Sequence, residues 1–327
     1  MTPRDRFIAA LERRPLTGRV PHFELVFFLT MEAFGRVHPL HRNYEQWLQM
    51  EERERDLHRR DMAGLYIASA ERFEHSAIFI HTNPGNDEEL LRMVDLIRGR
   101  TGDRYCLLTH GDATFAVPNG TDMEAFSCQM VDEPGKLKAQ TAGWVRDALE
   151  RAARLRRPGG IDGFALCADY CFNTGPFLSP ARFSEFVTPY LAELTRGYRD
   201  LGYYVIKHTD GNIMPILDQL AQTRPHALHS LDPQGGVDIA EVKRLYGRDL
   251  CLIGNVHCGM LDTGTPEQIE AAASYALRHG MPGGGYIFST SNCVYTGMPL
   301  ASYETMLGVW RREGNYPDKT VARGAGM

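Results

Sequence analysis

His208 and Asp210 are the two residues whose types and spacing most clearly allow chemistry. They close the run from Tyr203 to Asn212, in which aromatic and β-branched residues stop abruptly at His-x-Asp-Gly-Asn. Apolar residues then recur at helical spacing, so the run predicts a strand that leads into a helix. Because side chains two apart on a strand point the same way, the imidazole and the carboxylate can face one cavity.

A metal ion is the sharpest use for this pair. Imidazole, carboxylate and thiolate are all zinc ligands, and a catalytic zinc keeps one position open for substrate. Cys293, near the end of another predicted strand, would complete a set with His208 and Asp210. The alternative is that His208 is a hydrogen-bonded core histidine and Cys293 a small buried apolar residue. The sequence has neither Cys-x-x-Cys nor His-Glu-x-x-His to decide between them.

The elements that must position these residues alternate along the chain. Helical patterns separate about eight β-like runs, the second half of the chain being the more regular. The candidate strands, nine for about eight positions, are residues 20–28, 65–69, 77–81, 105–109, 163–167, 203–209, 226–231, 250–254 and 286–289. Helices are expected from Thr2, an N-cap, and at residues 43–60, 87–98, 134–155, 180–201, 213–220, 237–245, 266–278 and 300–311.

Strict alternation of strands and helices predicts a parallel sheet, because each crossover helix packs back on the sheet. Eight such units favour a single-domain α/β fold over residues 1–327, a (β/α)₈ TIM barrel, rather than an open doubly wound sheet. No Gly-x-Gly-x-x-Gly follows the first strand, which disfavours a nucleotide-binding sheet. In such a barrel, chemistry is expected at the C-terminal ends of the strands.

Composition excludes several function classes. The formal net charge is −5, and no cluster of excess Lys and Arg is present to bind nucleic acid or an anionic membrane. No apolar run is long enough to span a bilayer, and the N-terminus lacks the apolar block of a signal peptide. Seven scattered cysteines favour reduced thiols, so a cytoplasmic protein is expected.

Polar residues recur at the predicted strand ends, which is the main indication of a site. Solvated loops also collect polar residues, so each one alone could be unrelated to function. The residues are Glu24, His110, Asp112, Asp169, His208, Asp210, Ser230, Asp232, Asn255, His257 and the run Ser289-Thr290-Ser291-Asn292-Cys293.

Several longer motifs carry a resemblance that extends nearly end to end. They are Met1 to Phe7 with Arg19-Val20-Pro21, the stretch Asn173 to Pro189, His208 to Asn212, Ser230-Leu231-Asp232-Pro233, Ile253-Gly254-Asn255-Val256, Gly264-Thr265-Pro266-Glu267 and Gly283-Gly284-Gly285-Tyr286. With these motifs the chain resembles the uroporphyrinogen decarboxylase superfamily, and within it the branch of cobamide-dependent methyltransferases related to methylcobamide:coenzyme M methyltransferases. The resemblance implies a (β/α)₈ barrel.

The chain departs from both branches of that superfamily. In the decarboxylases, paired arginines after the first-strand Val-Pro bind the substrate's carboxylates, but here no arginine follows until Arg36. Glu24 and Glu32 carry the wrong charge for a tetrapyrrole rich in carboxylates. In the thiol-alkylating methyltransferases, a His-x-Cys motif and a later cysteine hold zinc; the matching positions are His208, Asp210 and Cys293, so the ligand set is richer in oxygen.

The resemblance therefore implies a zinc-dependent methyltransferase that moves a methyl group between a small substrate and the cobamide of a separate corrinoid protein. Asp-x-His-x-x-Gly, the lower-ligand motif of cobalamin-binding domains, is absent, so the cobamide would arrive on that partner. Glu24 is a candidate fourth ligand or proton donor. Asp169, Tyr170, Asn255 and His257 are candidates to contact substrate, although packing alone also explains Tyr170.

Two other function classes remain open from the sequence. A metal-free decarboxylase or lyase would use His208 and Asp210 as an acid/base pair on a small acid. A non-catalytic module would bind corrinoid proteins without transferring a methyl group, since a fold does not determine its function. The sequence does not fix the methyl donor, the direction of transfer or the oligomeric state, for which a homodimer is one option.

Overall fold

Seven parallel strands form the central sheet of the chain, in the order β10-β9-β8-β7-β4-β3-β2. The structure, a computed structural model, describes residues 1–81 and 83–317. Each strand pairs in parallel with its neighbours in the sheet. The strands are β2 (Ala77–Ile80), β3 (Cys106–His110), β4 (Gly163–Leu166), β7 (Tyr204–Thr209), β8 (Ala227–Ser230), β9 (Cys251–Val256) and β10 (Tyr286–Thr290).

A short extended segment around His22 closes the sheet into a barrel. His22 forms parallel bridges both to Phe288 in β10 and to His75, just before β2. The backbone N–H of Phe23 donates to the carbonyl of Phe288 (3.1 Å), and that of Ser76 donates to the carbonyl of His22 (2.7 Å). This segment is the eighth strand position, and the prediction of a single (β/α)₈ barrel is confirmed.

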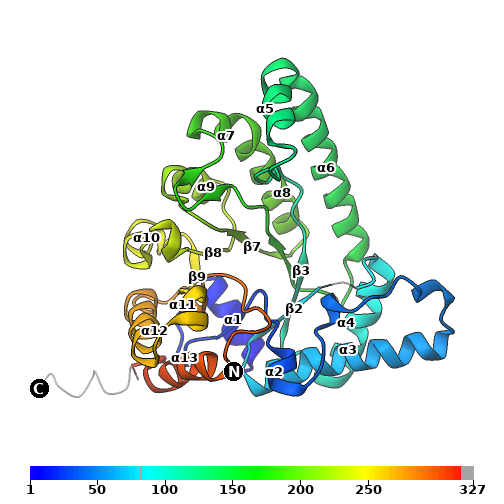
Figure 1. Cartoon of the computed structure of the whole chain (residues 1–327), viewed down its shortest axis with the longest axis vertical. Helices are drawn as coiled ribbons and strands as arrows, with labels where there is room; N and C mark the ends of the chain where they lie inside the picture. Colours follow the sequence, from blue (N-terminus) through cyan, green and yellow to red (C-terminus); the bar gives the residue numbers. More distant parts are fainter. Residues whose placement is uncertain (82, 318–327) are drawn as a thin grey trace, which may run out of the picture.

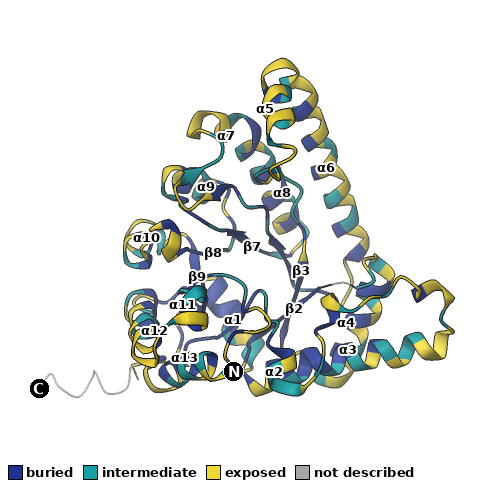
Figure 2. Cartoon of the chain, in the orientation of Figure 1, coloured by how far each residue is buried: buried dark blue, intermediate teal, exposed yellow. Residues whose placement is uncertain are grey.

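Helices surround the ring of strands and turn their apolar faces toward it (Figures 1 and 2). At the top of Figure 1, α5 and the start of α6 extend beyond the ring. The helices are α1 (Pro3–Leu11), α2 (Thr30–Phe34), α3 (Glu52–Arg72), α4 (Asp87–Thr101), α5 (Met123–Asp132), α6 (Pro134–Leu155), α7 (Pro180–Phe186), α8 (Thr188–Asp200), α9 (Leu217–Gln222), α10 (Ile239–Tyr246), α11 (Cys258–Thr263), α12 (Pro266–Gly280) and α13 (Leu300–Glu313). Two short antiparallel pairs complete the fold: β5 (Cys171–Phe172) with β6 (Gly175–Pro176), and β1 (Gly18–Arg19) with β11 (Asn315–Tyr316).

Helix α1 closes the N-terminal end of the barrel. Thr2 caps it as predicted: its hydroxyl accepts from the N–H of Asp5, and the Asp5 carboxylate accepts from the N–H of Thr2. The apolar face of α1 packs on the inward side chains of the strands. This inner core contains Phe7, Ala9, Ala10, Leu11, Leu16, Phe23, Leu25, Ala77, Phe79, Cys106, Leu108, Ala165, Ile206, Ala227, Cys251, Ile253 and Ile287.

Four of the predicted elements differ from the structure. Residues 65–69 lie inside helix α3, because a short apolar run does not distinguish a strand from a buried helical turn. The helix expected from residue 43 starts only at Glu52, and the one expected over 180–201 divides at Val187, before Pro189. The strand expected over 20–28 is reduced to isolated bridges at His22 and Phe27. Helix α5 lacked a clear sequence pattern and was not predicted.

Within the described residues, no helix combines the length and the apolar character that crossing a lipid bilayer requires.

Phe23 joins the closing segment to α1, since its buried ring lies 5.3 Å from that of Phe7 in an edge-to-face contact. We expect Phe23→Ala to lower the free energy of unfolding by about 3–5 kcal/mol, because it leaves a cavity where helix α1 packs on the strands of the barrel. Urea unfolding measures the change. Leu48→Ala, at a side chain that is 88% exposed, is the control and should change stability by less than about 0.5 kcal/mol. A loss below about 1 kcal/mol for Phe23→Ala would contradict this account of closure.

Candidate metal centre

The register of β7 and β8 places two histidines side by side at the C-terminal end of the barrel. His208 in β7 is the direct partner of His229 in β8. Ile206 and Ala227, two residues earlier, both belong to the inner core, so the alternation of side chains turns both histidines inward. His229 is fully buried, whereas His208 is 8% exposed and borders the mouth.

Asp169, His208 and Asp210 are the one group in the described residues whose ligand atoms lie close enough to hold a metal ion. Their ligand atoms all lie within 4.8 Å of one another. Nε2 of His208 is 3.8 Å from Oδ1 of Asp169 and 3.7 Å from Oδ1 of Asp210. These separations are too long for hydrogen bonds. Two ligands of a tetrahedral zinc ion lie about 3.4 Å apart, so the arrangement fits an ion after a small contraction.

His229 determines which nitrogen of His208 is available. The two Nδ1 atoms lie 2.7 Å apart in a hydrogen bond. When Nε2 of His208 offers its lone pair to an ion, its Nδ1 carries the proton and donates it to His229. Nε2 of His229 then carries a proton and lies 3.5 Å from the hydroxyl of Ser289. This is the arrangement by which outer hydrogen bonds fix the tautomer and orientation of a metal-binding histidine.

Hydrogen bonds from three different loops hold the two carboxylates. The backbone N–H of Asp210 donates to Oδ1 of Asp169 (3.0 Å). The Ser230 hydroxyl donates to Oδ1 of Asp210 (2.6 Å), and the Asn292 amide donates to its Oδ2. Burial raises the pKa of Asp210, with the charges of Asp169 and Asp232 adding to the shift and His208 opposing it. A cation would offset this concentration of negative charge.

A buried ion pair supports the loop that carries Asp169. Lys207, fully buried, donates to Oδ2 of Asp112 (3.0 Å) and to the carbonyl of Ala168 (2.8 Å), and its Nζ lies 4.1 Å from the centre of the Tyr170 ring. Burial alone would raise the pKa of Asp112, but Lys207 and the hydrogen bond from Thr114 hold it below its usual range. The pair fixes the position of the β4 loop directly before the candidate ligand.

The other predicted contact residues are held in packing or backbone contacts. Tyr170 is buried, its hydroxyl is 2.6 Å from that of Thr114, and its ring packs edge-to-face on Phe183. Asn255 is buried and its amide donates to the carbonyl of Leu231 (2.8 Å), which ties the end of β9 to the β8 loop. His257 is half-buried and precedes α11. Asp169, for which contact with substrate stays a prediction, lies beside His208 and Asp210.

Cys293 and Glu24 both lie near this centre without joining the cluster. The N–H of Cys293 donates to the side chain of Asn292, the residue that also holds Asp210. Burial raises the pKa of the Cys293 thiol to about 12, with further contributions from Cys258, Glu24 and Asp210. Glu24 is 3% exposed and does not belong to the inner core that contains its neighbours Phe23 and Leu25.

The Glu24 carboxylate lies in a buried polar cluster behind strand β10. It accepts from the hydroxyl of Thr290 (2.6 Å) and from that of Ser289 (3.0 Å), and its Oε1 lies 3.4 Å from Nε2 of His22. Ser289 also lies 3.5 Å from Nε2 of His229, so a continuous chain of polar contacts leads from Glu24 to His208. Glu24 therefore contacts the metal centre through other side chains.

Sequence patterns missed His229 and Lys207. Both lie within predicted strands, where a polar residue among apolar ones signals either an inward polar layer or an outward solvated face. Only the register between strands, which the sequence of one strand does not contain, places His229 opposite His208. Alternation along β7 could have placed His208 on the side opposite Lys207.

Comparisons with known proteins agree with the fold. The model of the uroporphyrinogen decarboxylase (URO-D) family matches residues 164–312, which include all three residues of the cluster. A methyltransferase from Methanosarcina mazei superposes with a TM-score of 0.72 and 16% sequence identity, covering 95% of this chain and 99% of that chain. A GH5_18 protein from Bifidobacterium longum subsp. infantis gives a TM-score of 0.49 and 11% identity, covering 92% of this chain and 80% of that one. No curated protein sequence matches significantly. At 16% identity, the similarity to the Methanosarcina mazei protein shows a shared fold.

Replacing His229 tests its role in orienting His208. We expect His229→Leu to weaken zinc binding about 10- to 100-fold, because Nδ1 of His208 loses its acceptor. His229→Gln, whose side-chain oxygen can accept the same hydrogen bond, should restore part of the affinity. Competition with a chromogenic chelator measures the dissociation constant. Equal zinc affinity in the Leu variant and the native chain would show that the contact is only packing.

Glu24 gives a pH-dependent contribution to stability. Burial raises its pKa from 4.5 to about 7, against the hydrogen bonds from Thr290 and the nearby His75. The unfolded chain releases this proton near pH 4.5 and the folded chain near pH 7, so raising the pH across that range favours unfolding by up to about 3 kcal/mol. Glu24→Gln removes this titration. Between pH 5 and pH 8, the free energy of unfolding should therefore decrease more for the native chain than for Glu24→Gln. Equal decreases in the two proteins would exclude the raised pKa of Glu24.

Proposed function

We propose that this chain, whose residues 164–312 belong to the uroporphyrinogen decarboxylase family, is a zinc-dependent methyltransferase. It moves a methyl group between a small substrate and the cobamide of a separate corrinoid protein. The observation that supports this most is the convergence of Asp169, His208 and Asp210 at the barrel mouth. The structural similarity to a methyltransferase along nearly the whole of both chains is consistent with it.

The donor set suits a Lewis-acidic ion. One imidazole and two carboxylates would hold zinc through His208, Asp169 and Asp210, leaving a fourth position for the substrate. Bound there, zinc would polarise the oxygen, nitrogen or sulfur that bears the methyl group. Oxygen ligands leave more positive charge on the ion than thiolates would, which favours this use.

The surrounding residues orient and hold the ligands. His229 fixes the tautomer of His208, and Ser230 with Asn292 fixes the carboxylate of Asp210. Lys207 anchors Asp112 and the carbonyl of Ala168, directly before Asp169. Each group is held by a neighbour on another strand, so the site is organised before the substrate arrives.

The charge at the mouth disfavours a substrate with many carboxylates. Asp169, Asp210 and Asp232 all follow strand ends, and Arg36, the first arginine after the first strand, pairs with Asp61. A tetrapyrrole acid would meet carboxylates where it needs cations. A small neutral methyl donor or acceptor meets no such repulsion.

Metal analysis of the purified full-length protein tests the proposal. We expect about one zinc ion per chain, and a loss of at least about tenfold in affinity for His208→Ala and Asp169→Asn. Asp147→Asn, at a side chain that is 70% exposed on α6, is the matched control and should bind zinc normally. Metal-free protein, or unchanged affinity in both ligand variants, would refute the metal centre.

Cys293→Ala decides whether sulfur joins the ligand set. Because Cys293 lies outside the cluster of three, we expect this variant to retain zinc. A loss equal to that of His208→Ala would instead make Cys293 a ligand that moves in when the ion binds. The activity itself is measured as methyl transfer between a methyl donor and free cob(I)alamin, a stand-in for the corrinoid protein.

A further inference from the structure

A second pair of histidines lies at the same end of the barrel interior, on β2 and β3. Nδ1 of His81, directly after β2, is 3.2 Å from Nε2 of His110 at the end of β3. Both rings pack edge-to-face on Phe79, with ring centres 4.8 and 4.6 Å away, and Phe79 belongs to the inner core. The pair therefore faces inward, as His208 and His229 do on β7 and β8.

His110 is the exposed member of the pair and lies beside the β4 loop that carries Asp169, since Cys167 and Ala168 of that loop line the same cavity. It lines a cavity of about 550 Å³ together with Asp112, Arg151 and Cys167, a size suited to a small organic molecule. Cys167 lies two residues before Asp169. Burial lowers the pKa of His110, and the nearby His208 lowers it further, so the two imidazoles lie within electrostatic reach of each other.

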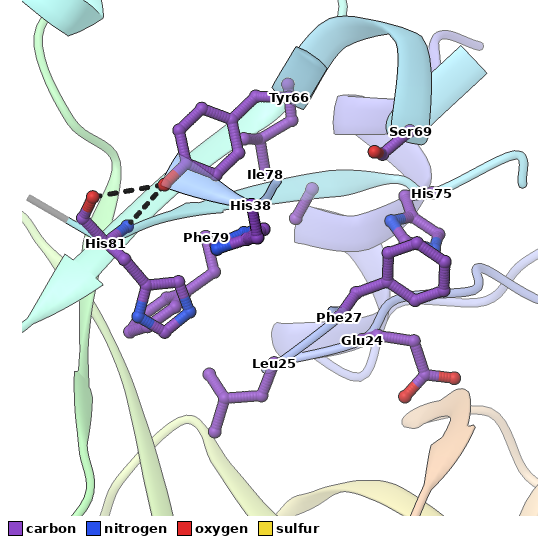
Figure 3. Close-up of a pocket in the computed structure, with 11 residues that line it drawn as sticks. Glu24, Leu25, Phe27, His38, Tyr66, Ser69, His75, Ile78, Phe79 and His81 are labelled. Atoms are coloured by element: carbon purple, nitrogen blue, oxygen red, sulfur yellow. Dashed lines mark hydrogen bonds between the residues drawn. The ribbon is translucent and has the colours of Figure 1, made fainter. Parts of the chain in front are cut away.

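His81 is the buried member and is held firmly. The Tyr66 hydroxyl donates to its carbonyl (3.1 Å) and accepts from its N–H (3.2 Å), the two contacts drawn in Figure 3. Its Nε2 is buried and has no hydrogen-bond partner among residues 1–81 and 83–317. Its ring borders a cavity of about 30 Å³, lined also by His38 and Glu24, which is large enough for a water molecule.

These contacts allow a proton to pass from the small cavity to His110. A proton taken up at Nε2 of His81 allows Nδ1 to pass its own proton to Nε2 of His110, whose Nδ1 then has a proton to give. Desolvation lowers the pKa of both imidazoles, and neighbouring histidines lower it further. A neutral imidazole can accept and donate in turn, which a permanently charged group cannot.

We propose that His110 is the catalytic proton donor to the substrate heteroatom from which the methyl group departs, and that His81 is the positioning residue that orients it and returns its proton. The inference rests on the proposed methyl transfer. For a methyl ether, the carbon–oxygen bond breaks and its electron pair stays on oxygen, which takes the proton of His110. The carbon–cobalt bond forms with the two electrons of the reduced corrinoid. In the reverse direction His110 accepts the proton.

Two methyl donors that differ in their need for a proton test this role. The full-length zinc-loaded protein is mixed with cob(I)alamin and either 2-methoxyphenol, whose oxygen must gain a proton, or tetramethylammonium, which leaves as neutral trimethylamine. We expect His110→Asn to slow transfer from the ether at least about 100-fold with zinc content unchanged, and added imidazole to restore part of the rate. Any transfer from tetramethylammonium should be unaffected.

Further variants separate orientation from folding. His81→Phe should slow transfer from the ether, whereas His81→Gln, which can still hydrogen-bond to His110, should recover part of it. His279→Asn, on α12 beside Tyr275, is the control and should match the native rate. If His110→Asn transfers the methyl group from 2-methoxyphenol at the native rate, this inference alone is overturned. The same holds if the native protein transfers a methyl group from tetramethylammonium but not from 2-methoxyphenol. A zinc-loaded native protein that transfers no methyl group from either donor overturns the proposed function, and this inference with it.

Discussion

The pairing of β7 with β8 is the constraint on which the candidate centre depends. It sets His208 directly opposite His229, and the 2.7 Å contact between their Nδ1 atoms leaves one nitrogen of His208 facing the mouth. A shift of one residue between these strands would turn one of the two side chains outward and break the contact. The backbone ladder of the barrel therefore determines the chemistry available at its end.

Buried polar groups are concentrated at this end of the barrel. Lys207 and Asp112 neutralise each other, and Glu24 is surrounded by hydroxyl and imidazole groups. Such groups contribute little net stability, because burial costs offset much of the attraction between them. Their effect is to fix loops and side chains in one geometry, which is what a site needs and what an apolar layer of the same volume would not provide.

The sequence was enough to predict the barrel, most of its strands and the pair His208 and Asp210. Alternating patterns are local, and each strand end was visible as a change from apolar to polar residues. It was not enough to predict that Asp169 would complete the cluster, or that His81 would meet His110, because these contacts join strands 29 to 41 residues apart. The closing segment was predicted too long, since residues around His22 pair at single positions rather than along a ladder.

The bridge at His22 has a consequence for the order in which the protein is made. It joins a residue near the start of the chain to Phe288, near its end, so the ring stays open during translation until β10 has left the ribosome. Until then, the apolar surface of Phe23 and of helix α1 lacks part of its packing partners, and the nascent chain exposes surface that can aggregate. Contacts so distant in sequence are slow to form, so synthesis of the last strand and folding of the first are coupled.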